Sequence, residues 1–145
     1  MKIILDKITV YLLYYIYNNY KRCDMFISID FNSETPIYEQ IKRQIVIGIY
    51  KGSLNEGDTL PSVRQLGVDI GVNLHTVNKA YKELQAMGYV VMDRRVGTMI
   101  NTAMPKLNED DLNSFKSEME YLISDWFNRG GSKAKLMEFI NKLEQ

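Results

Sequence analysis

Apolar residues recur at helical spacing in three segments between residues 35 and 88. The first segment carries a stripe of isoleucines four residues apart: Ile37, Ile41, Ile45 and Ile49. This spacing predicts a helix with one buried face. Thr35 is a suitable N-cap for it, and Pro36 suits its first position. An alternating run at residues 26–30 precedes this helix and is typical of a short strand.

Two further helices follow, separated by a tight turn. Pro61 precedes the first of them, whose apolar stripe is Val63, Leu66 and Ile70. Gly71 predicts the turn, because glycine readily adopts the positive φ that a helix-to-helix connection requires. Asn73 is placed to cap the next helix, whose core-facing stripe is Val77, Ala80, Tyr81 and Leu84. His75, Asn78, Lys79 and Lys82 then face solvent.

A β-hairpin is predicted after Gly88. Residues 89–92 and 99–100 are apolar, and the charged segment between them contains Gly97; this pattern is typical of two strands and their turn. Two helices joined by a short glycine-containing turn form a helix-turn-helix. The predicted fold is therefore mainly α with a small β-hairpin, a winged helix-turn-helix domain at residues 25–102.

Residues 103–145 predict a helical tail. Asn108 can cap a helix whose first turn holds three acidic residues, which the helix dipole favours. Gly130 and Gly131 interrupt the pattern, and Ser132 can cap a second helix. The apolar positions expected to form a dimer interface are Leu112, Phe115, Met119, Leu122, Ile123, Trp126, Phe139 and Leu143. Two short amphipathic helices cannot bury both stripes alone, so they pack on the first domain or on a second copy. For Phe115 and Trp126, packing is favoured over a ligand pocket.

Residues 1–24 have an unusual composition. Fourteen of them are Ile, Tyr, Asn or Lys, residues of AT-rich codons, and half of the ten tyrosines lie here. The apolar run at residues 8–17 is too short for a membrane span, and no small-residue cleavage site follows it. The hypothesis is that this extension is non-native or disordered and that Met25 is the natural start. The alternative is an additional amphipathic helix that covers the domain.

Composition excludes several classes of chemistry. Lys and Arg number 18 and so do Asp and Glu, so net charge alone indicates no polyanionic partner. One cysteine and one histidine allow neither a disulfide framework nor a Cys/His metal cluster, and no nucleophile is paired with His75. We expect a cytoplasmic protein that is not an enzyme and has no cofactor, no metal and no membrane partner.

The stretches LPSVRQL, GVNLHTVNKAY, LQAMGYV and RRVGT carry a specific resemblance. Residues 57–100 resemble the DNA-binding domain of GntR-type transcriptional regulators, and the third helix and the short tail are most similar to the YtrA subgroup. The resemblance implies a homodimeric repressor of double-stranded operator DNA, with control of transporter genes. Its third helix would enter the major groove, and its wing would lie along the minor groove.

The residues that this resemblance places at DNA are Arg64, Asn73, His75, Thr76, Asn78, Lys79, Arg94, Arg95, Gly97 and Thr98. Two positions depart from the family pattern: Arg95 replaces a usual glycine, and Asn78 replaces a residue that is often basic. Structural alternatives stay open for three of them. Asn73 is favoured as a helix cap, His75 can be an ordinary solvated side chain, and Arg64 can serve an internal salt bridge.

Two other functions are weighed against DNA binding. In another subgroup this domain is fused to a pyridoxal-phosphate aminotransferase-like fold, for which the residues after the wing leave no room. A winged helix that binds only proteins would need an apolar outer face on its third helix, and here that face is polar. This class is kept as the alternative, with the tail able to recruit a partner. A small-molecule effector, if one acts, would bind the dimer cleft or the tail interface.

Overall fold

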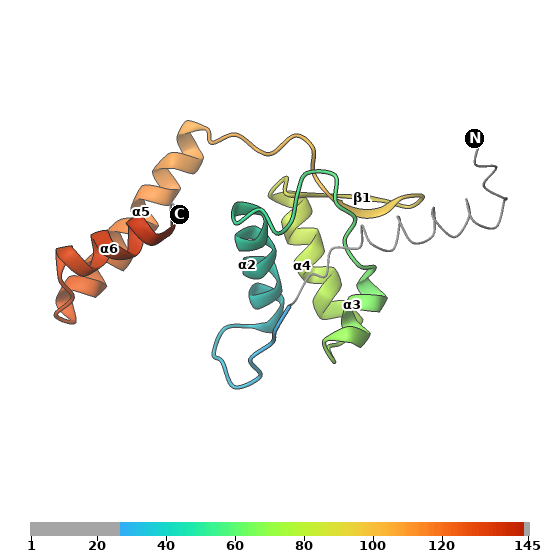
Figure 1. Ribbon diagram of the computed structural model, residues 1–145, viewed down its shortest axis with the longest axis horizontal. Coiled ribbons are helices and arrows are strands. Elements are labelled where there is room, and N and C mark those ends of the chain that lie inside the picture. Colours follow the sequence, from blue (N-terminus) through green and yellow to red (C-terminus); the bar gives the residue numbers. More distant parts are fainter. Residues whose placement is uncertain (1–26, 144–145) are drawn as a thin grey trace, which may run out of the picture. The chain divides into compact units, whose positions relative to one another are not determined.

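Figure 1 shows the computed structural model, which describes residues 27–143. Its elements are α2 (Ile37–Tyr50), α3 (Val63–Asp69), α4 (Leu74–Ala86), β1 (Val90–Asp93), β2 (Gly97–Ile100), α5 (Glu109–Asn128) and α6 (Lys133–Leu143). The predicted class, mainly helical with one antiparallel hairpin, is confirmed. The chain divides after Pro105 into two compact units. The hypothesis on residues 1–24 lies outside the described residues.

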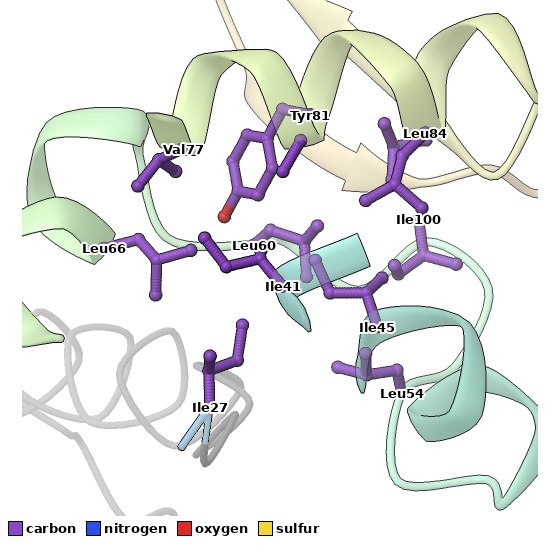
Figure 2. Close-up of a cluster of buried hydrophobic side chains, with 12 residues drawn as sticks. Ile27, Ile41, Ile45, Leu54, Leu60, Leu66, Val77, Tyr81, Leu84 and Ile100 are labelled. Atoms are coloured by element: carbon purple, nitrogen blue, oxygen red, sulfur yellow. The ribbon is translucent and has the colours of Figure 1, made fainter. Parts of the chain in front are cut away.

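The predicted apolar stripes meet in one core in the first unit (Figure 2). Its buried side chains come from α2, α3, α4, both strands and the loops: Ile27, Ile41, Ile45, Leu54, Leu60, Leu66, Val77, Ala80, Tyr81, Leu84, Val90 and Ile100. Tyr81 is fully buried, and its hydroxyl donates a 2.9 Å hydrogen bond to the Pro61 carbonyl. Burial raises the pKa of this phenol, since the charged form loses its hydration. Tyr81 therefore ties α4 to the residues that precede α3.

The turn between α3 and α4 depends on two glycines for two different reasons. Gly71 has a φ of +67°, which side chains with a Cβ rarely adopt. Gly67 lies within α3, where a Cβ atom would come within 2.8 Å of the Val72 carbonyl oxygen. The Val72 amide donates a 2.8 Å hydrogen bond to the Gly67 carbonyl. Close backbone approach at Gly67 thus brings the start of α4 against α3.

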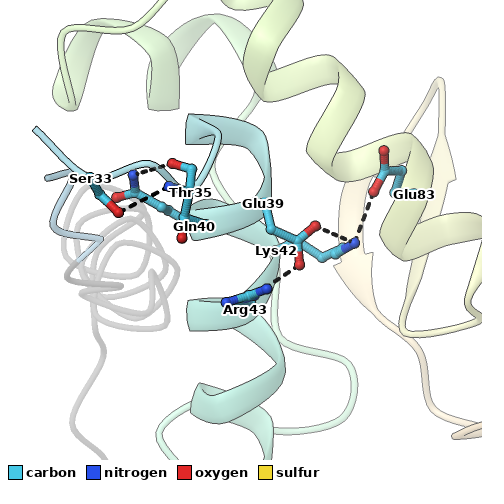
Figure 3. Close-up of polar contacts among 7 residues, drawn as sticks. All are labelled: Ser33, Thr35, Glu39, Gln40, Lys42, Arg43 and Glu83. Atoms are coloured by element: carbon cyan, nitrogen blue, oxygen red, sulfur yellow. Dashed lines mark hydrogen bonds and ion pairs between the residues drawn. The ribbon is translucent and has the colours of Figure 1, made fainter. Parts of the chain in front are cut away.

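The predicted start of α2 is wrong by one residue. Pro36 occupies the N-cap position and makes no side-chain cap, so Thr35 does not cap the helix. The Thr35 amide instead donates to Ser33 Oγ, as Figure 3 shows, and its carbonyl accepts from Gln40 Nε2. The Gln40 side chain therefore fixes the residue that the sequence assigned to capping.

No strand forms at residues 27–30, so this prediction is also wrong. Two glutamines of α2, one turn apart, take the place of a partner strand. Gln44 accepts from the Ser28 amide at 3.0 Å and donates to the Ser28 carbonyl at 2.7 Å. Gln40 pairs in the same way with the amide and carbonyl of Asp30. Side-chain amides satisfy the extended backbone, and Ile27 remains free to enter the core.

The wing consists of β1 and β2 in antiparallel register, with Val90 opposite Ile100 and Asp93 opposite Gly97. Residues 57–60 pair along the other edge of β2, a contact that the sequence does not predict. The Leu60 amide donates to the Thr98 carbonyl at 2.8 Å. These hydrogen bonds anchor the base of the hairpin, so its turn projects from a fixed support.

The second unit contains two helices, α5 and α6, joined by a short turn at residues 129–132. Asn108 and Asp111 form a reciprocal capping box at the start of α5, which confirms the predicted cap. Trp126 Nε1 donates to the Ser132 carbonyl at 3.2 Å, and a Cβ atom on Gly131 would overlap the indole ring. Residues 103–105, which the sequence assigned to the tail, lie in the first unit: Met104 packs against the core, and Pro105 lies against Gly88.

Candidate nucleic-acid interface

Helix α4 has two chemically opposite faces. Its inner face is the buried stripe described above. On the outside, His75, Lys79 and Lys82 are exposed, and Thr76 and Asn78 are half-buried. This face offers hydrogen-bond donors, acceptors and two ammonium groups, as the sequence predicts. A helix held by one face can thus present the other to a partner.

The start of α4 is capped by Asn73. Its side-chain oxygen accepts a 2.8 Å hydrogen bond from the His75 amide, so the capping interpretation is confirmed. The cap directs the first exposed side chains of the helix outward. The positive end of the helix dipole favours an anion there.

Lys79 lies on the outer face but already has a contact within the fold. Its ammonium nitrogen is 3.5 Å from the centroid of the Tyr38 ring of α2, a cation–π contact. The charge is therefore held at the border between α2 and α4. The sequence predicts an exposed lysine here and does not reveal the aromatic support.

A salt-bridge network joins α2 to α4 close to the interface (Figure 3). Lys42 Nζ lies 2.6 Å from Glu39 Oε2 and 3.0 Å from Glu83 Oε2, and Arg43 Nε lies 2.9 Å from Glu39 Oε1. The hydrogen bond from Lys42, with a smaller contribution from Arg43, holds the pKa of Glu39 below its ordinary value. The same hydrogen bond to Glu39 raises the pKa of Lys42. Helical spacing reveals the pairs within α2; only the fold reveals Glu83.

Arg64 is exposed on α3, in the second position of that helix. Ser62 caps α3 by accepting a hydrogen bond from the Gln65 amide, and the Gln65 side chain donates to Asp69. Within residues 27–143 no carboxylate pairs with Arg64, so the internal salt-bridge alternative has no support there. Its guanidinium can reach outward.

The wing turn presents Arg94 and Arg95 to solvent. Asp93 closes this turn, because its Oδ1 accepts from the Arg95 amide at 2.6 Å and the Val96 amide at 3.1 Å. Arg95 needs no positive φ; Gly97, with a φ of +92°, adopts it instead. The replacement of a glycine by Arg95 is thus compatible with a closed hairpin.

Thr98 differs from the other predicted contact residues of the wing in its burial. Thr98 is buried, with only 6% of its surface exposed, so little of it is accessible to DNA. Its partner across the hairpin is Met92. A contribution of Thr98 to binding would therefore come from shaping the hairpin.

The part of the chain that the structure describes offers neither a metal site nor a membrane span. Residues 27–143 contain no group of three His, Cys, Asp or Glu side chains placed to hold a metal ion. No helix in this range combines the length and apolar character that a membrane span requires.

Three helices around a shared core, a tight α3–α4 turn and a supported hairpin define a winged helix-turn-helix protein. The family model for bacterial regulatory proteins of the gntR family matches residues 37–100. The chain is 42% identical over 118 residues to the HTH-type transcriptional repressor YtrA of Bacillus subtilis (strain 168), covering 81% of this chain and 91% of that relative. The chain belongs to the gntR family and, within it, to the YtrA subgroup.

Solved structures agree with this assignment. A transcriptional antiterminator from Listeria monocytogenes EGD-e superposes with a TM-score of 0.75 at 30% identity, covering 83% of this chain and 90% of that one. YtrA from Sulfolobus acidocaldarius, a GntR-family transcription factor, has a TM-score of 0.57 at 37% identity. The match covers 68% of this chain and 97% of that one. The chain is a DNA-binding transcriptional regulator, and the comparisons favour this function over a winged helix that binds only proteins.

Proposed function

We propose that this regulator is a cytoplasmic repressor that binds double-stranded operator DNA as a homodimer. Helix α4 enters the major groove, and the wing turn follows the adjacent minor groove. One observation carries the proposal: α4 builds the core with one face and turns a polar, partly basic face to solvent. The major groove accommodates an α-helix and offers it a distinct pattern of donors and acceptors for each base pair.

Base recognition is assigned to the outer side of the first two turns of α4. Asn78 can bond adenine N6 and N7 with its amide, and His75 and Thr76 can reach neighbouring base edges or phosphates. Asn73 contributes mainly as the cap, since its oxygen is already occupied by the His75 amide. The positive end of the helix dipole at this terminus suits a phosphate.

Phosphate binding is assigned to the exposed cations around α4. Arg64 on α3, Lys82 on α4 and Arg94 and Arg95 on the wing are all exposed. Lys79 joins them with its ammonium supported by the Tyr38 ring. Gly97 lets the wing backbone turn close to the sugar–phosphate chain. Such contacts release condensed counterions, so they strengthen binding most at low salt.

Dimerisation is assigned to the tail. Within residues 109–143 neither α5 nor α6 contains a buried residue. Large apolar side chains stay exposed along both helices, among them Leu112, Phe115, Leu122, Trp126, Phe139 and Leu143, while Met119 and Ile123 are half-buried. A second copy would cover this stripe, as two-fold homodimers commonly do.

The experiment that tests DNA recognition is fluorescence anisotropy with the DNA upstream of the regulator's own gene and with a scrambled duplex. Wild type is expected to prefer the upstream DNA. Asn78→Ala should lose about 1–3 kcal/mol on that DNA, because an edge contact disappears. Asn113→Ala, an exposed asparagine of α5 away from the apolar stripe, is the matched control.

Measurement at two salt concentrations separates the two kinds of contact. Arg94→Ala should weaken binding to both duplexes and lower the salt slope by about one unit, as loss of one phosphate contact does. Equal binding of wild type to both duplexes would contradict sequence-specific recognition. Absence of binding to either would contradict the assignment of α4 to the groove.

A further inference from the structure

One large apolar side chain is exposed within α4. Leu74, the first residue of the helix, is 45% exposed and is followed by the exposed His75. It lies neither in the buried core nor among the half-buried apolar residues that pack against that core. A large apolar side chain is thus left at the end of the helix that carries the base-contacting residues.

Folding does not require leucine at this position. The close approach of α4 to α3 involves the Leu74 backbone: a Cβ built on Gly67 would lie 3.6 Å from the Leu74 amide nitrogen and Cα. The cap is supplied by Asn73 and the His75 amide, not by Leu74. Alanine has a higher helix propensity than leucine and would leave these backbone contacts in place. The exposed part of the side chain therefore has no assigned role in the fold.

The major groove has one apolar feature, the 5-methyl group of thymine. Because α4 enters the groove by its N-terminal end, Leu74 would be among the first side chains to meet the bases. We propose that Leu74 is a specificity-determining residue that packs on the 5-methyl group of one thymine in each operator half-site. This inference rests on the proposed groove-binding function and adds to it one base identity.

The test removes only the methyl group. A duplex is first selected from random sequences by the wild-type chain, and each thymine in it is then replaced singly by deoxyuridine. At one thymine in each half-site the replacement should weaken wild-type binding about fourfold, the effect of exposing one methyl-sized apolar group. Leu74→Ala should bind both versions of that duplex equally. Leu74→Met, which remains apolar, should keep a preference for thymine.

Met87→Ala is the matched control. Met87 is also 45% exposed and is the C-cap of the same helix, about 20 Å from Leu74 at the rise of an α-helix. It should retain the full response to deoxyuridine. Equal deoxyuridine effects in wild type and Leu74→Ala, or no effect at any thymine, would overturn the assignment of Leu74. Failure of wild type to select any duplex over scrambled DNA would overturn the proposed function itself.

Discussion

Single residues shape the candidate nucleic-acid interface by the space that they leave as well as by their chemistry. Gly71 permits the backbone conformation of the α3–α4 turn, whereas Gly67 leaves room for the Val72 carbonyl. Asn73 then fixes the first turn of α4 through the His75 amide. The direction of the outer face of α4 depends on these local conditions, which involve no contact with DNA.

Gly67→Ala tests the space requirement. A methyl group 2.8 Å from the Val72 carbonyl oxygen forces α3 and the turn apart, so we expect a loss of about 1–3 kcal/mol in the free energy of unfolding. Urea denaturation followed by circular dichroism measures it. Val68→Ala, one residue away on the exposed side of α3, should change stability by less than about 0.5 kcal/mol. Equal stability of Gly67→Ala and wild type would contradict the role of Gly67.

At the scale of elements, α2 holds α4 in two ways. Their apolar faces meet in the core, and the Lys42–Glu83 ion pair and the Lys79–Tyr38 contact join their edges. Lys42 lies between Glu39 of its own helix and Glu83 of α4, so it connects the two helices. The position of α4 therefore depends partly on charges that titrate.

Glu39→Gln should alter the pH dependence of stability. The pKa of Glu39 is lowered in the folded state, so its ionised form stabilises the fold above the ordinary carboxyl value of 4.5. This stabilisation is lost as pH falls below that value through the lowered pKa. Unfolding free energies from urea titrations between about pH 3 and about pH 7 should decline less steeply in the variant than in wild type.

The matched control for this pH effect is Glu56→Gln, an exposed glutamate without an ion pair in residues 27–143. The unfolding free energy of this variant should decline with falling pH as steeply as that of wild type. If the stability of wild type and of Glu39→Gln fell equally steeply with acid, ionised Glu39 would not stabilise the fold through Lys42 and Arg43.

For the whole molecule, the two units divide the tasks. The first unit buries a complete core, whereas α5 and α6 leave their apolar residues uncovered. An unpartnered stripe of this kind favours association with a second copy. A dimer also presents two copies of α4, which fits an operator made of two half-sites.

Phe115→Glu tests the association. Phe115 is 57% exposed in one copy, so glutamate at this position leaves α5 folded but places a charge in the proposed interface. Sedimentation velocity should show a dimer for wild type and a shift toward monomer for the variant. The loss should amount to about 1.5–3 kcal/mol for each phenylalanine that is no longer buried.

Ser117→Glu adds the same charge on the opposite side of α5 and should remain dimeric. A monomeric wild type, or equal dimer fractions in both variants, would contradict the assignment of the tail stripe. Operator affinity should fall with the dimer fraction in Phe115→Glu, because the two half-sites would then be bound separately.

Local sequence patterns were sufficient for the helices, the hairpin, the core stripes and the Asn73 and Asn108 caps, because each depends on residues within a few positions of one another. The same patterns misplaced the start of α2 and predicted a strand at residues 27–30. In both places the side-chain amides of Gln40 and Gln44 make hydrogen bonds to the backbone of residues 28–35.

Contacts between distant segments could not be read from such patterns. The resemblance places Thr98 at DNA, and only the fold shows that this residue is buried. The sequence predicts that Lys79 is exposed, and only the fold shows the Tyr38 ring of α2 beneath its ammonium group. The sequence pattern assigned no role to Leu74, and its exposure became apparent only in the folded structure. Spacing along the chain therefore sufficed to predict the winged helix-turn-helix, and the resemblance of its motifs indicated the class of regulator. Which polar and apolar side chains remain available to DNA followed only from folding, because burial depends on neighbours that are remote in the sequence.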